Sequence, residues 1–265
     1  MLGLRAPGAR PIELSVLEAL AVLAAGVWAG VVNTVVGSGT LITFPVLLAV
    51  GYPPLTANVS NSLGLVPGSL SGAYGYRREL AGQRARFLRF APASVLGSLI
   101  GAALLLILPA SAFEAIVPVF VALALVLVVL QPRLNRWLLA RRHADAAPDG
   151  GRVPLLLNGL LGIYGGYFGA AQGIMMLGIL GVALDDDIQR VNALKNVLSG
   201  LVNLTAAIVF LFVAHLAWEA VVLLAVGSTL GGQFGARIGR RLPAPALRAV
   251  IVVVGLAAIA KLLLD

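Results

Sequence analysis

Apolar segments of helix length follow one another from about residue 12 to residue 264, and short connections that hold most of the arginines separate them. This alternation constrains the fold most, because so many apolar helices can be kept from water only inside a bilayer. The 265-residue chain is 60% hydrophobic and 11% charged, whereas a soluble domain carries about 25% charged residues. The sequence therefore predicts an all-α, polytopic membrane protein.

Two of the ten predicted segments are too short to cross a hydrocarbon core of about 30 Å, which needs about 20 helical residues. Each of the two is interpreted as re-entrant or as half of a broken helix, so that about eight segments span fully. The ten predicted segments are 12–36, 40–50, 55–76, 90–108, 112–131, 153–169, 173–184, 187–214, 216–236 and 245–264.

The second half of the chain repeats the first at a nearly constant offset. Sliding the sequence by 134 places Asn58 on Asn192 and Ser62 on Asn196. The same shift pairs Gly97 with Gly231, Gly101 with Gly235 and Pro109 with Pro243, and a shift of 132 pairs Gly30 with Gly162 and Gly37 with Gly169. We therefore divide the chain into a first transmembrane repeat (12–131), a basic cytoplasmic linker (132–152) and a second repeat (153–265).

The arginines predict how the two repeats are oriented. The loop 77–89, the linker and the stretch 237–248 hold 14 of the 19 lysine and arginine residues, whereas the connections 109–111 and 214–218 hold none. Basic connections face the cytoplasm, so segment 55–76 runs inward and its counterpart 187–214 runs outward. The repeats are therefore inverted, an architecture that places substrate near the midplane of the bilayer. The side of the N-terminus is left open, because Arg5 and Arg10 favour the inside and the symmetry favours the outside.

Small polar residues cluster where the predicted helices are interrupted. Glycines and polar side chains at membrane depth are tolerated where protein buries them or where they line a wet cavity; close helix packing is the alternative interpretation. Lys195 lies about eight residues into its segment, hence about 12 Å deep, and a cation at that depth usually faces an interior cavity unless it snorkels. One face of its helix carries Asn192, Lys195, Asn196, Ser199 and Asn203, and segment 55–76 presents Thr56, Asn58, Ser62 and Ser69.

Hydrogen-bond donors without deep carboxylates favour an anion as the ligand, especially beside helix N-termini that follow the interruptions. Tyr164, Tyr167 and Gln172 can add hydroxyl and amide groups, although each tyrosine is also a good packing residue. The predicted substrate-binding residues are Asn33, Ser38, Thr40, Asn58, Ser62, Gln172, Asn192, Lys195 and Asn196, and the predicted gating positions are Gly37, Gly39, Gly169 and Gly173.

Other chemistry finds few candidates in this sequence. The chain has no cysteine and only two histidines, and it contains no Ser/His/Asp arrangement, phosphate-binding glycine loop or metal-spaced cluster. We therefore expect no enzyme, cofactor or bound metal. The acidic run Asp185–Asp187 is interpreted as a helix cap. The net charge of +8 does not indicate nucleic acid, because the arginines lie in short loops that meet anionic headgroups.

Several motifs resemble a known family of membrane proteins. They are GVVNTVVGSGTLITFPVLL, ANVSNSLGLVPGSLSG, NGLLGIYGGYFGAAQG, VNALKNVLSGLVN and GGQFGARIGRRLP. From about residue 14 to residue 264 the chain is similar to the sulfite exporter TauE/SafE family. The resemblance implies a bacterial inner-membrane permease for small anions that often contain sulfur, such as sulfite, sulfonates and thiosulfate.

We therefore expect a secondary transporter that moves a small anion by alternating access. A non-transporting membrane scaffold is the main alternative, and a cation or metal permease is a weaker one because it calls for deep carboxylates or His/Met clusters. The expected partners are a small anion and the lipid bilayer, without nucleic acid. The sequence leaves the anion, the direction, the coupling ion and the oligomeric state open, a homodimer included.

Overall fold

The computed structural model describes residues 14–140, 151–238, 249, 251–257 and 259–260. Every regular element in these ranges is a helix, which confirms the predicted all-α class. The helices between residues 16 and 238 are α1 (Val16–Val35), α2 (Thr40–Ala49), α3 (Pro54–Gly64), α4 (Val66–Gly75), α5 (Arg84–Ile107), α6 (Ala110–Ala140), α7 (Arg152–Tyr167), α8 (Gln172–Ala183), α9 (Ile188–Val213) and α10 (Trp218–Ile238).

Five of these helices, α1, α5, α6, α9 and α10, are long and apolar enough to cross a bilayer. The helices α3 and α4 adjoin at Leu65 and together cover the predicted segment 55–76. The prediction of one unbroken helix there was wrong, because Pro67 lacks the N–H that would continue the hydrogen-bond ladder. The short helices α2 and α8 match the two segments predicted to be too short to span. The fold is that of a polytopic membrane protein.

Local sequence signals set several helix ends. At the start of α1, the backbone amide of Ser15 donates to the carboxylate of Glu18 at 2.8 Å, and the Ser15 hydroxyl accepts from the Glu18 amide at 3.3 Å, which is a capping box. Pro54 stands in the first turn of α3, where its missing N–H is harmless. The helices α1 and α7 each run into a glycine with positive φ, Gly37 at 90° and Gly169 at 77°. The interruptions therefore occur where they were predicted.

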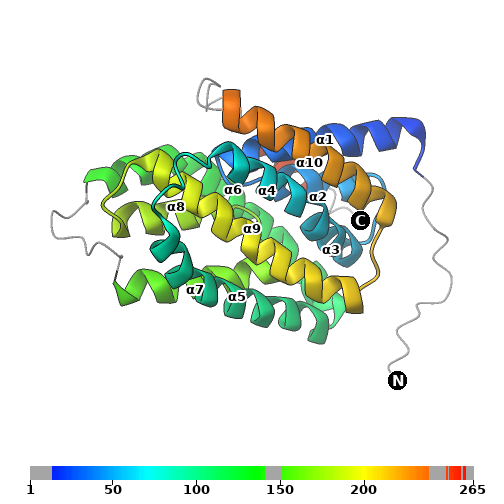
Figure 1. The fold of residues 1–265 in the computed structure, drawn as a ribbon. Coiled ribbons are helices and arrows are strands. Elements are labelled where there is room, and N and C mark those ends of the chain that lie inside the picture. The colour runs from blue at the N-terminus through cyan, green and yellow to red at the C-terminus, as the bar shows by residue number, and fades with distance from the viewer. Residues whose placement is uncertain (1–13, 141–150, 239–248, 250, 258, 261–265) are drawn as a thin grey trace.

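The connections between helices gather at two ends of the molecule (Figure 1). At one end, the side-chain amide of Gln83, which precedes α5, donates through Nε2 to the backbone carbonyl of Arg190 in α9 at 2.8 Å. At the other end, the Ser60 hydroxyl of α3 accepts from the amide of Ala217 before α10 at 2.9 Å. We call the first end the arginine-rich end; it holds connections 76–83 and 184–187. We call the second the opposite end; it holds connections 50–53, 108–109 and 214–217.

The helices α1 and α2 form a re-entrant hairpin that starts and finishes at the opposite end. Burial first, and then the charges of Glu219 and Glu18, raise the pKa of Tyr52, which follows α2. The end of α2 and the first turns of α1 and α10 therefore lie at the same end of the molecule (Figure 1). The helices α7 and α8 form the second hairpin, which starts and finishes at the arginine-rich end (Figure 1). Because the two hairpins enter from opposite ends, the repeats are inverted, as predicted. Helix α1 starts at the opposite end, which is the side that the repeat symmetry favoured. Arg5 and Arg10 favoured the other side.

The two halves interlock. The helix α1 of the first half packs against α10 of the second, and α5 of the first half packs against α7 of the second. Glycines let the backbones touch: a Cβ on Gly231 would overlap the carbonyl oxygen of Val27, and a Cβ on Gly101 would overlap that of Ile163. Since the repeat relates α1 to α7 and α10 to α5, the two contacts are equivalent. The two halves are therefore interlocked and do not form two separate bundles.

Some predicted boundaries shift in the structure. Arg84, Arg86 and Arg89 lie in the first turns of α5 and not in a loop, because helix α5 begins at Arg84. The helix α6 continues through Ala140, into the segment interpreted as a linker, and the division into repeats stays a prediction. In the last predicted segment, 245–264, residues 251–257 and 259–260 are helical, and most of the remainder lies outside the described residues.

The interlocked glycines predict a position-specific loss of stability. A Cβ on Gly97 would overlap the Gly159 carbonyl oxygen and lie 2.9 Å from the amide nitrogen of Ile163. We expect Gly97→Ala to lower the thermal unfolding midpoint in detergent, by the equivalent of about 1–3 kcal/mol, as overpacking does. The control is Gly159→Ala in the same helix pair, whose Cβ would find its nearest neighbour, Ala93, at 3.7 Å. Equal midpoints for the two variants would contradict this account of the interface.

Candidate functional site

The two re-entrant hairpins meet at Gly37 and Gly173. The backbone amide of Gly173 donates to the carbonyl of Gly37 at 3.1 Å. A Cβ on either glycine would lie 2.6 Å from the Cα of the other, so no larger residue fits without displacing the backbone. We call this contact the crossing. Gly37 follows the end of α1 and has a positive φ, and Gly173 lies in the first turn of α8.

The incoming helices α1 and α7 end at the crossing in the same way. The amide of Gly37 donates to the carbonyl of Val32 at 2.9 Å, and the amide of Gly169 donates to the carbonyl of Tyr164 at 3.0 Å. These two pairs are related by the same repeat offset that matches Gly37 with Gly169 in the sequence. The carbonyls in the last turn of each helix lack partners within that helix, so other groups must donate to them.

Two asparagines at equivalent positions of the repeats supply such donors. Asn58 in α3 donates through Nδ2 to the carbonyl of Tyr167, the last residue of α7, at 2.9 Å. Asn192 in α9 donates through Nδ2 to the carbonyl of Thr34, near the end of α1, at 3.2 Å. Each asparagine thus caps the interrupted helix of the other half. The pairing of Asn58 with Asn192 in the sequence has a structural counterpart.

Lys195 is fully buried beside the end of α1. Its Nζ donates to the carbonyl of Asn33 at 3.1 Å, and Asn196 donates through Nδ2 to the carbonyl of Thr34 at 3.2 Å. These carbonyls form the negative end of the α1 dipole, which favours a cation. Among the described residues Lys195 has no carboxylate in an ion pair. Full burial excludes the alternative that this side chain snorkels to the membrane surface.

Four buried polar atoms around the crossing have no hydrogen-bond partner among the residues that the structure describes. They are Ser38 Oγ, Asn58 Oδ1, Gln172 Nε2 and Asn192 Oδ1. Their residues are at most 6% exposed, and all four were predicted to bind substrate. Buried polar atoms are nearly always paired, so a cluster of unpaired ones calls for an explanation. A polar ligand at the crossing would provide one.

Other predicted site residues form hydrogen bonds or close contacts with residues of the protein itself. The Ser62 hydroxyl donates to the Asn58 carbonyl at 3.0 Å, and Asn33 donates through Nδ2 to the Ser69 hydroxyl at 3.3 Å. Gly39 is needed for the tight turn between α1 and α2, because a Cβ there would lie 2.7 Å from the carbonyl oxygen of Ala29. The predicted residues thus lie where α1 and α7 end and α2 and α8 begin, and on α3 and α9, and we call this set the polar layer.

Two residues of this layer were missed. Thr40 accepts from Asn61 Nδ2 at 3.3 Å, and the Asn61 Oδ1 accepts from the hydroxyl of Thr43. The repeat offset that matches Asn58 with Asn192 also places Asn61 on Lys195, which is the signal that could have identified it. Thr43 is fully buried within the apolar helix α2 and carries no comparable signal.

The tyrosines of α7 pack against aromatic rings. Tyr164 and Tyr167 both contact the ring of Phe120 in α6, with centroids 5.5 and 6.0 Å apart. The Tyr164 hydroxyl donates to the Ala170 carbonyl at 2.6 Å. These contacts favour packing over substrate binding for the two tyrosines.

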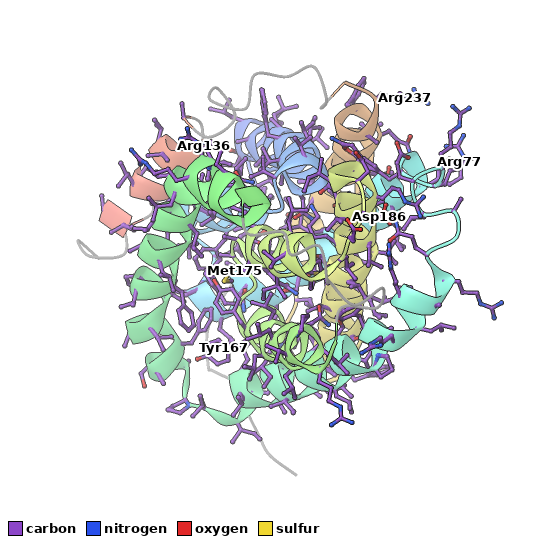
Figure 2. All side chains as sticks on the ribbon, turned by 90° about the vertical axis from the view of Figure 1, so that its left-hand side faces the viewer. Arg77, Arg136, Tyr167, Met175, Asp186 and Arg237 are labelled. Atoms are coloured by element: carbon purple, nitrogen blue, oxygen red, sulfur yellow. The ribbon has the colours of Figure 1, made fainter. Side chains whose placement is uncertain are left out.

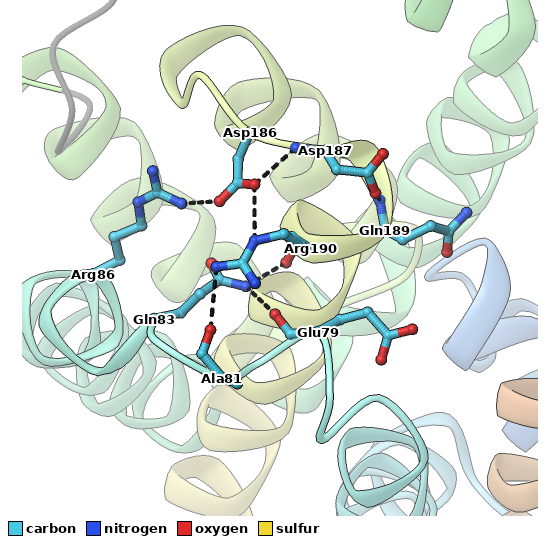
Figure 3. Close-up of polar contacts among 8 residues, drawn as sticks. All are labelled: Glu79, Ala81, Gln83, Arg86, Asp186, Asp187, Gln189 and Arg190. Atoms are coloured by element: carbon cyan, nitrogen blue, oxygen red, sulfur yellow. Dashed lines mark hydrogen bonds and ion pairs between the residues drawn. The ribbon is translucent and has the colours of Figure 1, made fainter.

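A charged network ties the two halves together at the arginine-rich end (Figure 3). Asp186, between α8 and α9, pairs with Arg86 of α5 and accepts from Arg190 Nε at 2.8 Å. Arg190 in turn donates to the Ala81 carbonyl at 3.2 Å. Burial raises the pKa of Asp186, but its hydrogen bonds with Arg86 and Arg190 outweigh this effect and hold the pKa below its usual range. The network joins α5 to the start of α9.

The capping role predicted for the acidic run is confirmed for Asp187, whose side chain accepts from the Gln189 amide at 2.8 Å. In a view onto the arginine-rich end, Arg77, Arg136 and Arg237 lie around the rim, and Asp186 lies further inside (Figure 2). Among the described residues, no group of three or more His, Cys, Asp or Glu side chains could hold a metal ion.

Comparison with known proteins gives a consistent set of relatives. The model of the family described as sulfite exporter TauE/SafE matches residues 22–262. A protein of Sinorhizobium sp. named "Probable membrane transporter protein ORF9" is 31% identical over 239 residues, 89% of each chain. "Probable membrane transporter protein YfcA" of Escherichia coli K12 is 28% identical over 256 residues, 96% of this chain and 91% of that one. A "Probable membrane transporter protein" of Haemophilus influenzae is 28% identical over 252 residues, 94% and 96% of the two chains. No solved structure matches the chain.

The charged network predicts a pH-dependent contribution to stability. A carboxylate whose pKa is lowered by folding stabilises the folded state above its ordinary pKa of about 4, and that contribution is lost as pH falls through the folded-state pKa. We therefore expect Asp186→Asn to lower the thermal unfolding midpoint at neutral pH, and the difference from wild type to shrink below about pH 4.

The matched control is Asp185→Asn, which removes the same charge from an exposed neighbouring position. Its midpoint should stay close to that of the wild type at both pH values. A difference between Asp186→Asn and wild type that does not change with pH would refute the role assigned to the network.

Proposed function

The chain belongs to the sulfite exporter TauE/SafE family, and on that premise we propose that it is a secondary transporter of a small, sulfur-containing anion such as sulfite, a sulfonate or thiosulfate. Family membership and the relatives support the coarser statement, that it is a multi-pass membrane transporter and not an enzyme. Because the relatives are bacterial, we place it in the bacterial inner membrane. The lipid bilayer and the anion are its proposed partners, and a homodimer is one proposed assembly.

The observation that carries the proposal is the buried ammonium of Lys195 beside the crossing. Its one hydrogen-bond partner among the described residues is a backbone carbonyl, at Asn33, and no carboxylate neutralises it. A fully buried charge without a counterion is costly. An anion bound at the crossing would supply the counterion, and Ser38 and Gln172 offer it two unpaired donors, Oγ and Nε2.

The inverted hairpins support alternating access. One hairpin reaches the crossing from the opposite end and the other from the arginine-rich end, and the two are in backbone contact at Gly37 and Gly173. Small shifts of one hairpin against the other would open one route at a time. At the arginine-rich end, opening would also have to break the ion pairs of Asp186.

A second candidate function is that of a non-transporting membrane scaffold. It is favoured by the fact that Lys195, Asn192 and Asn196 all donate to the last carbonyls of α1, which is a structural capping role. Capping alone does not require a lysine at position 195, because the uncharged amide of Asn58 caps α7. It therefore does not explain why Lys195 is a cation without a counterion. We therefore favour the transporter.

A flux measurement distinguishes the two functions. Lys195→Gln keeps a side-chain donor for the Asn33 carbonyl but removes the charge. We expect it to lower the initial rate of sulfite or sulfonate uptake into proteoliposomes about tenfold or more, because it removes a hydrogen bond to a charged group. Its thermal unfolding midpoint should change far less than its rate.

The control is Arg77→Gln, which removes the same charge from the arginine-rich end, where Arg77 lies over the Tyr74 ring. This variant should transport at nearly the wild-type rate. If Lys195→Gln and wild type carry every anion tested at equal rates, the site is misassigned. If neither carries any anion, the proposal of anion transport is wrong.

A further inference from the structure

The unpaired atoms at the crossing include acceptors as well as donors. Asn58 and Asn192 each face a backbone carbonyl, which can only accept a hydrogen bond. The atom that faces the carbonyl must therefore be the amide nitrogen, and the atom left without a partner must be Oδ1. Both Oδ1 atoms are buried and unpaired. The structure thus leaves two acceptors that no donor among the described residues satisfies.

The two acceptors are equivalent by the repeat. Asn58 and Asn192 are matched by the repeat offset, and each caps the helix that ends at the crossing in the other half. A single unpaired oxygen could be an isolated feature of packing. Two equivalent ones, on either side of the Gly37–Gly173 contact, indicate a shared requirement of the site.

The nature of the donors and acceptors selects the ligand. Lys195, Ser38 and Gln172 can donate to an anionic oxygen, and one ammonium group matches one negative charge. An oxyanion without hydrogens offers only lone pairs, so it would leave both asparagine oxygens unpaired and facing negative charge. Leaving buried acceptors unpaired weakens binding substantially.

We propose that the substrate is a monoanion that carries its own N–H or O–H donors, and that Asn58 Oδ1 and Asn192 Oδ1 accept from them. Protonated oxyanions, sulfamate and hydroxyl-substituted sulfonates belong to this class. Fully deprotonated or methyl-capped anions of the same size do not. This inference rests on the proposed function and specifies which anions the same site selects.

Sulfamate and methanesulfonate test the inference directly. Both are monoanions at neutral pH with the same –SO₃⁻ group and similar size, but sulfamate carries an NH₂ group where methanesulfonate carries CH₃. We expect proteoliposomes that contain the wild-type protein to take up sulfamate roughly tenfold faster than methanesulfonate, the effect of about one buried hydrogen bond. Uptake is measured by ion chromatography of the filtered vesicles, with protein-free vesicles as the blank.

Variants separate recognition from a structural role. Asn58→Ala and Asn192→Ala should each lower the ratio of the sulfamate rate to the methanesulfonate rate, because each removes one of the two acceptors. A merely structural role would lower both rates together and leave the ratio unchanged. The control is Asn158→Ala: Asn158 also has a buried, unpaired Oδ1, but it lies near the start of α7, where it donates to Ser94, and its loss should keep the ratio.

The outcomes separate this inference from the function on which it rests. If methanesulfonate is carried as fast as sulfamate or faster, the requirement for donors is wrong while anion transport stands. If the ratio in Asn58→Ala and Asn192→Ala equals that of the wild type, the two asparagines are not the acceptors. If sulfamate, methanesulfonate, sulfite and thiosulfate all fail to enter above the blank, the proposed function itself is wrong.

Discussion

The fold depends on satisfying the backbone of two helices that end inside the protein. Lipid offers no partners to the last carbonyls of α1 and α7, so α9 and α3 provide them through Asn192 and Asn58. The repeat does not treat the two helices identically, because Lys195 and Asn196 in α9 correspond to Asn61 and Ser62 in α3. Asn61 binds the two threonines Thr40 and Thr43, whereas Lys195 brings a charge to the end of α1. A nearly symmetric scaffold thereby acquires one positive site at the crossing.

The glycine contacts decide which parts of the molecule can move as units. The helix α1 is in backbone contact with α10, and α5 is in backbone contact with α7, so each hairpin is anchored to a helix of the other half. Motion of one hairpin must carry its partner helix with it. The rigid units are therefore these interlocked pairs and not the two halves of the sequence. At the arginine-rich end, the ion pair of Asp186 with Arg86 also holds α5 to the α8–α9 connection.

Much of this arrangement could be predicted from the sequence. The short segments, the glycines at their starts and the arginine distribution are local signals, and they indicated the re-entrant hairpins and the inversion. The constant offset between the repeats also pointed to Asn58 and Asn192. The break at Leu65 and the interlocking of α1 with α10 could not be predicted, because they depend on which helices pack together. For the same reason, the sequence did not indicate that Thr43 belongs to the polar layer or that Lys195 contacts a carbonyl of α1. The repeat offset from Lys195 could have identified Asn61.

The central claim is that the crossing is a substrate site that opens to each side of the membrane in turn. The chain has no cysteine, so Ser38→Cys introduces a single thiol at a position that is 1% exposed here. The direct measurement is the rate at which a membrane-impermeant thiol reagent, added outside or trapped inside proteoliposomes, modifies this residue. The account predicts modification from both sides and slower modification in the presence of a transported anion. Modification from only one side, or a rate that no anion changes, would contradict it.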